Sequence, residues 1–208
     1  MPRKHSRRVV AGLTLAALLP AGQGCGTAAP LEAPGSPAPS AATAPSAASP
    51  SPSPTAAPDP KLAAILAGKR KIIIHLIPAD RDLSATYEGP IATGDGTDDG
   101  ALFRILPAKN GRYLVEALRA REEGGRWCAA VQTEDNLTTL TTVECQEAAE
   151  TTFTIEATGA VDDKKRPAHR IVNDDYGTVR WKPAGQVLFL DKAGDSPATF
   201  SFVDRGAA

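Results

Sequence analysis

Three segments of this 208-residue chain end in the same way, with a small residue two positions before a phenylalanine that opens a strand-like run. These phenylalanines are Phe103, Phe153 and Phe200, and they lie 50 and 47 residues apart. Ile72 precedes the first of them by 31 residues, and His169 precedes the last by the same 31 residues. A repeat of this length indicates three similar structural units, each of which closes on an aromatic side chain.

The middle unit follows the same order over a longer stretch, since Tyr113 precedes Phe153 by 40 residues. Short apolar runs separated by Gly, Asp, Asn and Pro fill all three units, which favours β-strands over helices. Three such units predict an all-β fold, a β-trefoil with pseudo-symmetric repeats at about residues 70–111, 112–167 and 168–206. The closing aromatic of each repeat is expected to point toward a shared axis. A β-sandwich is the competing architecture.

The strand-like runs are residues 72–77, 102–106, 113–115, 128–131, 138–143, 153–156, 171–172, 178–181, 187–190 and 200–203. Residues 113–123 have helical propensity, but pairing with other strands overrides a weak local preference, so we expect a strand at Tyr113. Before the first strand, residues 61–67 predict either one or two turns of helix or a helix-prone tail of the preceding linker.

The first 25 residues have the layout of a secretory signal peptide. Residues 1–8 carry four positive charges and no acid, and they run into an apolar stretch at residues 9–19. At about 1.5 Å per residue this stretch is too short to cross a membrane core about 30 Å thick. The pair Arg7-Arg8 leaves both the twin-arginine and the general export route open.

Cys25 follows a small residue and resembles the acylated cysteine of a bacterial lipobox, although Gly22 stands where that pattern prefers leucine. Lipidation would anchor the protein to the cell membrane, and membrane contact is expected only through this anchor. Ordinary cleavage near Ala28 would instead release a secreted protein without Cys25. Residues 26–60 contain ten prolines, many alanines and serines and only two charged residues, which predicts a disordered, extended linker.

Residues 61–208 are numerous enough for one domain with its own core. They hold 19 basic and 22 acidic residues, a net charge of −3, and no basic stripe with interleaved aromatics, which argues against nucleic acid as a partner. The sequence contains no H-E-x-x-H, G-x-S-x-G or phosphate-cradling glycine loop. We therefore expect a binding protein that uses no cofactor, rather than an enzyme.

Three aspartates in the stretch TGDGTDDG, Asp95, Asp98 and Asp99, resemble part of a calcium loop. Their spacing does not match D-x-D-x-D-G, so turn formation is the better interpretation. His75 and His169 lie in strand-like runs without metal-ligand spacing, and we expect them to fill the core or the surface. The sequence thus predicts no metal site.

Cys128 and Cys145 are the only cysteines after residue 25, and an even number of thiols in an exported protein favours a disulfide between them. The stretch that they enclose resembles the ricin-type β-trefoil lectin repeat, in which a cysteine followed by apolar residues pairs with another about seventeen residues later. The chain as a whole resembles a ricin-type lectin domain in a bacterial, actinobacterial-type, secreted lipoprotein. This resemblance implies a structural disulfide and carbohydrate binding.

The sugar-reading residues of those lectins are only partly present. Ala130 stands where the lectins commonly carry an aspartate, and phenylalanine replaces the tryptophan of each closing motif. Other aromatic and polar side chains could take over, and the candidate ligand-binding residues are Trp181, Tyr176, Asp174, Asp175, Asn173 and Trp127. The alternative is that the two tryptophans pack against the barrel.

Residues 177–187 resemble the closing repeat of mushroom β-trefoil protease inhibitors, which act through a rigid exposed loop. A basic loop residue would suit a trypsin-like protease, and the candidates are Lys164, Lys165 and Arg166, with residues 119–126 as a second loop. Both loops are also compatible with ordinary solvated turns. We expect a glycan as the first candidate partner and a secreted protease as the second. A trefoil that only provides a scaffold for protein contacts is the third possibility.

Overall fold

Almost all regular structure in this protein is β-sheet, as the sequence predicts. The computed structural model describes residues 59–194 and 197–208, so the predicted signal peptide, Cys25 and the linker up to residue 58 lie outside the described residues. One short helix, α1 (Pro60–Leu66), precedes the strands. The strands are β1 (Arg70–Leu76), β2 (Arg81–Ala85), β3 (Ile91–Gly94), β4 (Phe103–Pro107), β5 (Tyr113–Ala117), β6 (Trp127–Glu134), β7 (Leu137–Glu144), β8 (Thr154–Val161), β9 (Pro167–Asn173), β10 (Gly177–Lys182), β11 (Val187–Asp191) and β12 (Phe200–Ala207).

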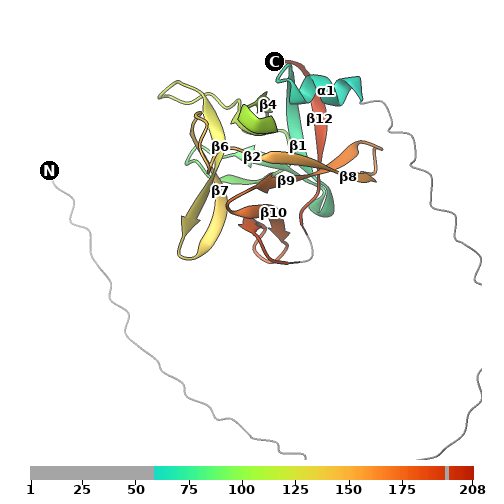
Figure 1. The fold of residues 1–208 in the computed structure, drawn as a ribbon. Coiled ribbons are helices and arrows are strands. Elements are labelled where there is room, and N and C mark those ends of the chain that lie inside the picture. Colours follow the sequence, from blue (N-terminus) through green and yellow to red (C-terminus); the bar gives the residue numbers. More distant parts are fainter. Residues whose placement is uncertain (1–58, 195–196) are drawn as a thin grey trace, which may run out of the picture. The chain divides into compact units, whose positions relative to one another are not determined.

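Six of these strands close into a ring, because β1 pairs with β4, β4 with β5, β8 with β9, β9 with β12 and β12 with β1. A bridge between Tyr113 and Phe153 joins β5 to the start of β8 and completes the barrel. The other six strands form three hairpins, β2–β3, β6–β7 and β10–β11. A closed six-stranded barrel with three hairpins is a β-trefoil, so the fold prediction is confirmed and the β-sandwich alternative is excluded (Figure 1).

The repeat in the sequence corresponds to equivalent pairings in the barrel. Ile72 lies opposite Phe103, Tyr113 opposite Phe153, and His169 opposite Phe200. These are the pairs whose spacings define the three units in the sequence. A fixed distance along the chain therefore records a fixed partner across the barrel.

The three closing phenylalanines form the centre of the core. Phe103, Phe153 and Phe200 are 0%, 1% and 0% exposed, and they belong to one hydrophobic cluster with residues from all three units. The free space that remains inside the barrel is about 10 Å³. A single water molecule needs roughly 10–15 Å³, so the barrel is filled by side chains.

Two local predictions are confirmed and one element was missed. The segment that begins at Tyr113 is strand β5, despite its helical propensity. The helical turns expected at residues 61–67 are present as α1, whose first turn is capped by Asp59 accepting a hydrogen bond from the Lys61 amide at 2.9 Å. The β2–β3 hairpin was not predicted, because the run RDLSA at Arg81–Ala85 is rich in polar residues and has no β-branched residue.

The helix α1 covers part of the barrel. Ile65 is buried, and Leu62 and Leu66 pack against the core. Figure 1 shows α1 beside β12 and the C-terminus, and the β10 strand at the lower end of the same view. Within residues 59–194 and 197–208, no helix is both long enough and apolar enough to span a membrane.

The predicted disulfide is confirmed. Cys128 in β6 is bonded to Cys145 immediately after β7, with their Cα atoms 4.8 Å apart. Two residues with positive φ, Asp135 at 48° and Asn136 at 64°, form the tight turn between these strands, which matches the twist that a two-residue hairpin requires. On chain-entropy grounds a cross-link over a loop of this length stabilises the fold by about 3 kcal/mol.

Candidate functional site

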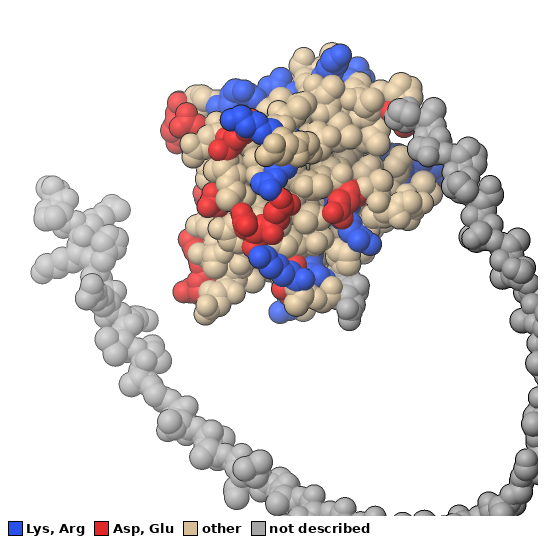
Figure 2. All heavy atoms as spheres, in the orientation of Figure 1, with Lys and Arg blue, Asp and Glu red and all other residues tan. Residues whose placement is uncertain are grey.

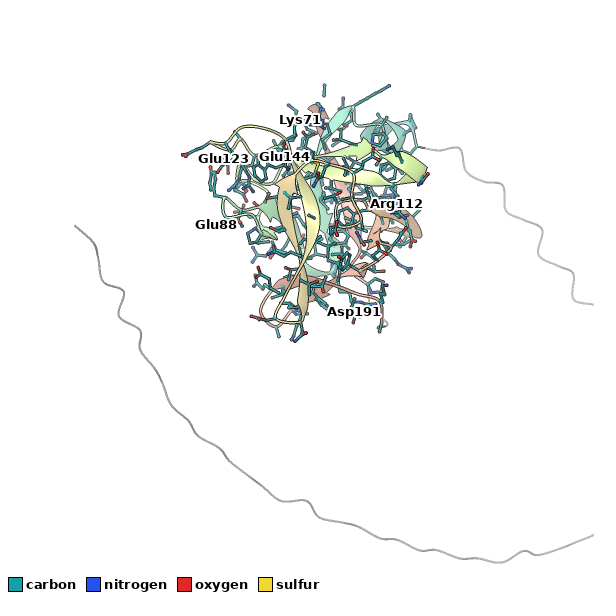
Figure 3. All side chains as sticks on the ribbon, turned by 60° about the vertical axis from the view of Figure 1, so that its left-hand side comes forward. Lys71, Glu88, Arg112, Glu123, Glu144 and Asp191 are labelled. Atoms are coloured by element: carbon teal, nitrogen blue, oxygen red, sulfur yellow. A yellow bond between two sulfur atoms is a disulfide. The ribbon has the colours of Figure 1, made fainter. Side chains whose placement is uncertain are left out.

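A cleft of about 350 Å³ lies between the turn that joins β2 to β3 and the loop that joins β5 to β6, residues 118–126. We call it the Tyr87 cleft. Its lining residues are Tyr87, Ala120, Arg121, Glu122 and Glu123. In Figure 3, Glu88 of the first segment and Glu123 of the second lie on the same side of the molecule, away from Arg112.

The Tyr87 ring is held in place from behind by a charged cluster. The Arg119 guanidinium carbon lies 4.0 Å from the ring centroid, a cation–π contact. Arg119 also forms an ion pair with Asp99 at 2.5 Å, and the Tyr87 hydroxyl donates a hydrogen bond to the same carboxylate at 2.5 Å. The hydrogen bond to Asp99 raises the pKa of Tyr87, so the phenol keeps its proton. The cluster fixes one face of the ring and leaves the side chain 64% exposed.

A second arginine fastens the loop to the hairpin. Arg121 donates hydrogen bonds to the backbone oxygens of Thr86 and Tyr87, both at 3.3 Å, and to the Thr142 hydroxyl. Its guanidinium carbon lies 4.3 Å from the centroid of the Trp127 ring. The Trp127 indole donates to the Gly124 carbonyl oxygen at 2.8 Å. Trp127, a predicted ligand-binding residue, thus supports the loop from within, with one face covered by Arg121.

The end of the loop is fixed by a buried carboxylate. Glu116 accepts hydrogen bonds from Arg126 and from Arg104, both at 2.7 Å. Burial alone would raise the pKa of Glu116, but the hydrogen bonds from these two arginines outweigh it and lower the pKa. The carboxylate is therefore ionised, and residues 118–126 hang between two fixed ends.

The groups left for a ligand are an aromatic ring and two carboxylates. Glu122 and Glu123 are exposed, and neither forms an ion pair with a described residue. An exposed ring can pack against an apolar face, and carboxylate oxygens accept hydrogen bonds from hydroxyl groups. Figure 2 shows basic and acidic side chains interspersed over the visible face of the domain.

The predicted site in the third unit looks different. Asn173 is 1% exposed, and its amide nitrogen donates to the backbone oxygens of Ala149 at 2.7 Å and Thr152 at 3.1 Å. Its amide oxygen accepts from the backbone nitrogens of Asp175 at 3.0 Å and Tyr176 at 3.1 Å. Because these bonds occupy both ends of the amide, Asn173 acts as a turn-forming residue and we leave it out of the candidate site.

Its predicted companions are divided between the surface and the core. Asp174 and Asp175 are exposed, and Asp174 forms an ion pair with Arg112. Tyr176 and Trp181 are half-buried and pack against the hydrophobic cluster. The structure thus favours the packing alternative for Trp181. Ala130, where the lectins carry an aspartate, is buried in β6.

The basic loop between β8 and β9 is organised around Asp162. This buried carboxylate accepts hydrogen bonds from the backbone nitrogens of Lys164 at 2.9 Å and Arg166 at 2.8 Å, from the Arg166 guanidinium and from the Ser201 hydroxyl at 2.6 Å. Burial favours the neutral acid, but these hydrogen bonds outweigh it and hold the pKa of Asp162 far below its usual range. Lys164 and Lys165 remain exposed, whereas Arg166 is tied to Asp162.

The aspartates of TGDGTDDG serve as acceptors within the chain. Asp95 accepts from the Thr97 amide at 3.1 Å, and Asp98 accepts from the Gly100 amide at 2.7 Å and the Ser84 hydroxyl at 2.6 Å. His75 lies 2.9 Å from Asp82. No cluster of three metal-ligating side chains occurs among the described residues.

No protein-family model and no curated protein sequence matches this chain. Among solved structures, the designed three-fold symmetric protein ThreeFoil matches 65% of this chain and 99% of its own, with 12% identity and a TM-score of 0.51. The lysenin pore matches 68% of this chain with 14% identity and a TM-score of 0.51, and this chain spans about half of it, 47%. The BEL β-trefoil matches 65% of this chain and 93% of its own, with 11% identity and a TM-score of 0.49. Likeness at these identities is a likeness of fold, and it agrees with the β-trefoil described above.

Sequence analysis had singled out two parts of this cleft, Trp127 and residues 119–126, but not Tyr87. The signal for Tyr87 is present in the sequence, since Thr86-Tyr87-Glu88-Gly89-Pro90 places an aromatic residue within a turn-forming run. Its significance depends on Arg119, which is 32 residues further along the chain. The contact between them requires the hairpin that sequence analysis missed.

Proposed function

We propose that this protein is an extracellular carbohydrate-binding module and that the Tyr87 cleft is its sugar site. The observation that carries the proposal is the Tyr87 ring, which is 64% exposed and fixed on one face by Arg119, in a cleft that also contains Glu122 and Glu123. A pyranose has an apolar face of C–H groups and a rim of hydroxyls. The free face of Tyr87 suits the first, and the carboxylates suit the second.

Pre-organisation supports this function. Tyr87 is anchored by its hydroxyl and by Arg119, and the loop opposite is anchored by Arg121. Ordering a side chain on binding costs about 0.5–1.5 kcal/mol, and a ring that is already fixed avoids this cost. A weak ligand such as a single sugar needs that advantage.

Export belongs to the same proposal. The basic and apolar segments of residues 1–25 direct the chain out of the cell, and acylation of Cys25 tethers it to the membrane through the linker of residues 26–60. The disulfide between Cys128 and Cys145 supports this location, because such bonds persist in oxidising compartments. Labelling of cells with a radioactive fatty acid tests it: the label should enter the wild-type protein and be lost in Cys25→Ala.

A glycan array probed with the full chain tests sugar binding. The wild type should bind a defined set of glycans, and Tyr87→Ala should lose at least tenfold in affinity because the packing face is gone. Leu137→Ala is the matched control, since Leu137 is an exposed apolar residue at the other end of the β6–β7 hairpin from Trp127. Binding that survives in Tyr87→Ala, or that disappears equally in Leu137→Ala, would refute the assignment.

Inhibition of a trypsin-like protease is the second candidate function. The observation in its favour is the Asp162 network, which rigidifies a loop that exposes Lys164 and Lys165. Rigid presentation of a basic residue is what such an inhibitor needs. If trypsin is inhibited by the wild type and by Tyr87→Ala but not by Lys165→Ala, this function replaces the first. If the protein neither binds glycans nor inhibits trypsin, the scaffold role is the one that remains.

A further inference from the structure

A second cavity, of about 240 Å³, lies between α1 and the barrel and shares no residue with the Tyr87 cleft. Leu62 and Ile65 of α1 line one side of it. Pro167 and His169 of β9 and Phe202 of β12 line the other. We call it the α1 groove. It is formed mainly by apolar side chains, with His169 as the buried polar group.

His169 is unusual because it is buried without a hydrogen-bond partner. Its side chain is 3% exposed and stacks on Phe202, with the ring centroids 4.9 Å apart. Neither ring nitrogen forms a hydrogen bond with a described residue. Burial lowers the pKa of His169, so the ring is neutral near pH 7. A neutral imidazole offers one donor and one acceptor, and each costs about 1–3 kcal/mol when buried unmatched.

The charged residues around the groove are mostly engaged with one another or with the backbone. Arg166 binds Asp162, and Asp204 forms an ion pair with Arg70 at 2.7 Å. Asp59 caps α1. These partners leave the imidazole as the polar group of the groove that most needs a ligand, and they give an ionic ligand little to bind.

We propose that the α1 groove binds a small uncharged molecule with an apolar body and one hydroxyl or carbonyl group. The body packs between Leu62, Ile65 and Phe202, and the polar group forms a hydrogen bond with His169. A purely apolar molecule would fill the same space but leave the imidazole unmatched, which lowers its affinity. The cavity is smaller than a typical pocket for a drug-sized ligand, roughly 300–1,000 Å³, so the ligand is small.

Binding here has a mechanical consequence for the helix. A molecule in the α1 groove contacts both α1 and the barrel, so it strengthens the attachment of the helix. The helix is only seven residues long, and a helix of this length depends on packing for its stability. Occupancy of the groove and the order of α1 are therefore coupled.

Two probes test the proposal on the full chain. Benzyl alcohol carries the required hydroxyl, and toluene is the matched molecule without it. In NMR titrations, benzyl alcohol should shift the amide signals of α1, β9 and β12 and the imidazole nitrogen signals of His169, while the signals of Tyr87 and Glu122 stay in place. Benzyl alcohol should bind at least fivefold more tightly than toluene.

Two variants complete the experiment. In His169→Phe the groove keeps its shape but loses the nitrogens, so the preference for benzyl alcohol over toluene should disappear. In Leu62→Trp the larger side chain should fill the groove and abolish binding of both probes, and an unchanged barrel spectrum would show that the protein is folded. Equal affinity of the wild type for the two probes, shifts scattered over the surface, or no binding of either probe would each overturn the proposal. Glycan binding through Tyr87 is unaffected in either case, so the two sites are tested separately.

Discussion

The segment from β8 to β10 and the Tyr87 cleft contain the same kinds of side chain, yet they use them in opposite ways. In the first, Asp162 and Asn173 are buried and accept or donate four hydrogen bonds each within the chain. In the second, Glu122 and Glu123 are exposed, and the buried bonds are made by arginines behind the ring. A polar residue is available to a ligand only where the nearby backbone does not need it.

The largest effect is expected at Asp162. Asp162→Asn should lower the free energy of unfolding by about 3 kcal/mol, because it breaks a buried ion pair with Arg166 and places an amide against several donors. The pKa of Asp162 is lowered by folding, so its stabilisation is present above the ordinary pKa of an aspartate and is lost as the pH falls below it.

Urea unfolding of both proteins as a function of pH measures this. The wild type should lose stability on acidification more steeply than Asp162→Asn. The neighbouring exposed residue supplies the control, and Asp163→Asn should change little. Equal effects of the two substitutions would mean that the Asp162 network does not hold the loop.

Asn173 comes next. Asn173→Ala should cost about 2 kcal/mol in unfolding free energy, because it leaves the buried carbonyl oxygen of Thr152 without its donor and removes the acceptor for two turn amides. Glycan affinity should stay within twofold of wild type. Asp175→Ala, next to it on the surface, is the control and should affect neither quantity. A loss of glycan binding without a loss of stability would restore the third unit as the sugar site.

A smaller effect on stability, about 1 kcal/mol, is expected at Arg119, which supports Tyr87 from behind. Arg119→Ala should nevertheless lower glycan affinity severalfold, because the ring is no longer fixed. Comparison of thermal unfolding with isothermal titration separates the two quantities. Unchanged affinity would show that the position of the ring does not depend on its arginine.

The smallest effect is expected at Asp174. Its ion pair with Arg112 is exposed, and exposed pairs contribute about 0–1 kcal/mol. Asp174→Ala should therefore change stability by less than about 0.5 kcal/mol and leave glycan binding intact. A double-mutant cycle with Arg112→Ala measures the coupling. A coupling above about 1 kcal/mol would place this pair among the structural ones, with Asp162.

The fold could be predicted from the sequence because it depends on a repeated spacing, which the chain displays directly. Ile72 with Phe103 and His169 with Phe200 have the same separation and the same pairing. The site could not be predicted in this way, because it depends on contacts without a repeat. Tyr87 belongs to the first unit and Arg119 to the second, and their stacking follows only from the assembled barrel.

The third unit shows the opposite failure. Asn173, Asp174 and Asp175 next to Tyr176 suggest a ligand site by residue type alone. The sequence does not show that the amide of Asn173 is consumed by Ala149 and Thr152, which lie more than twenty residues earlier. Hydrogen-bond saturation is a property of the fold.

The pairing of β1 with β12 determines how the domain would respond to pulling. Arg70 lies opposite Ala207, so the first and last strands run antiparallel and both ends of the described domain leave from the same side. A force applied between these two ends would break the β1–β12 hydrogen bonds one after another, as in a zipper, instead of loading them all together. A tether attached at one end alone would spare the seam and leave the domain closed under drag.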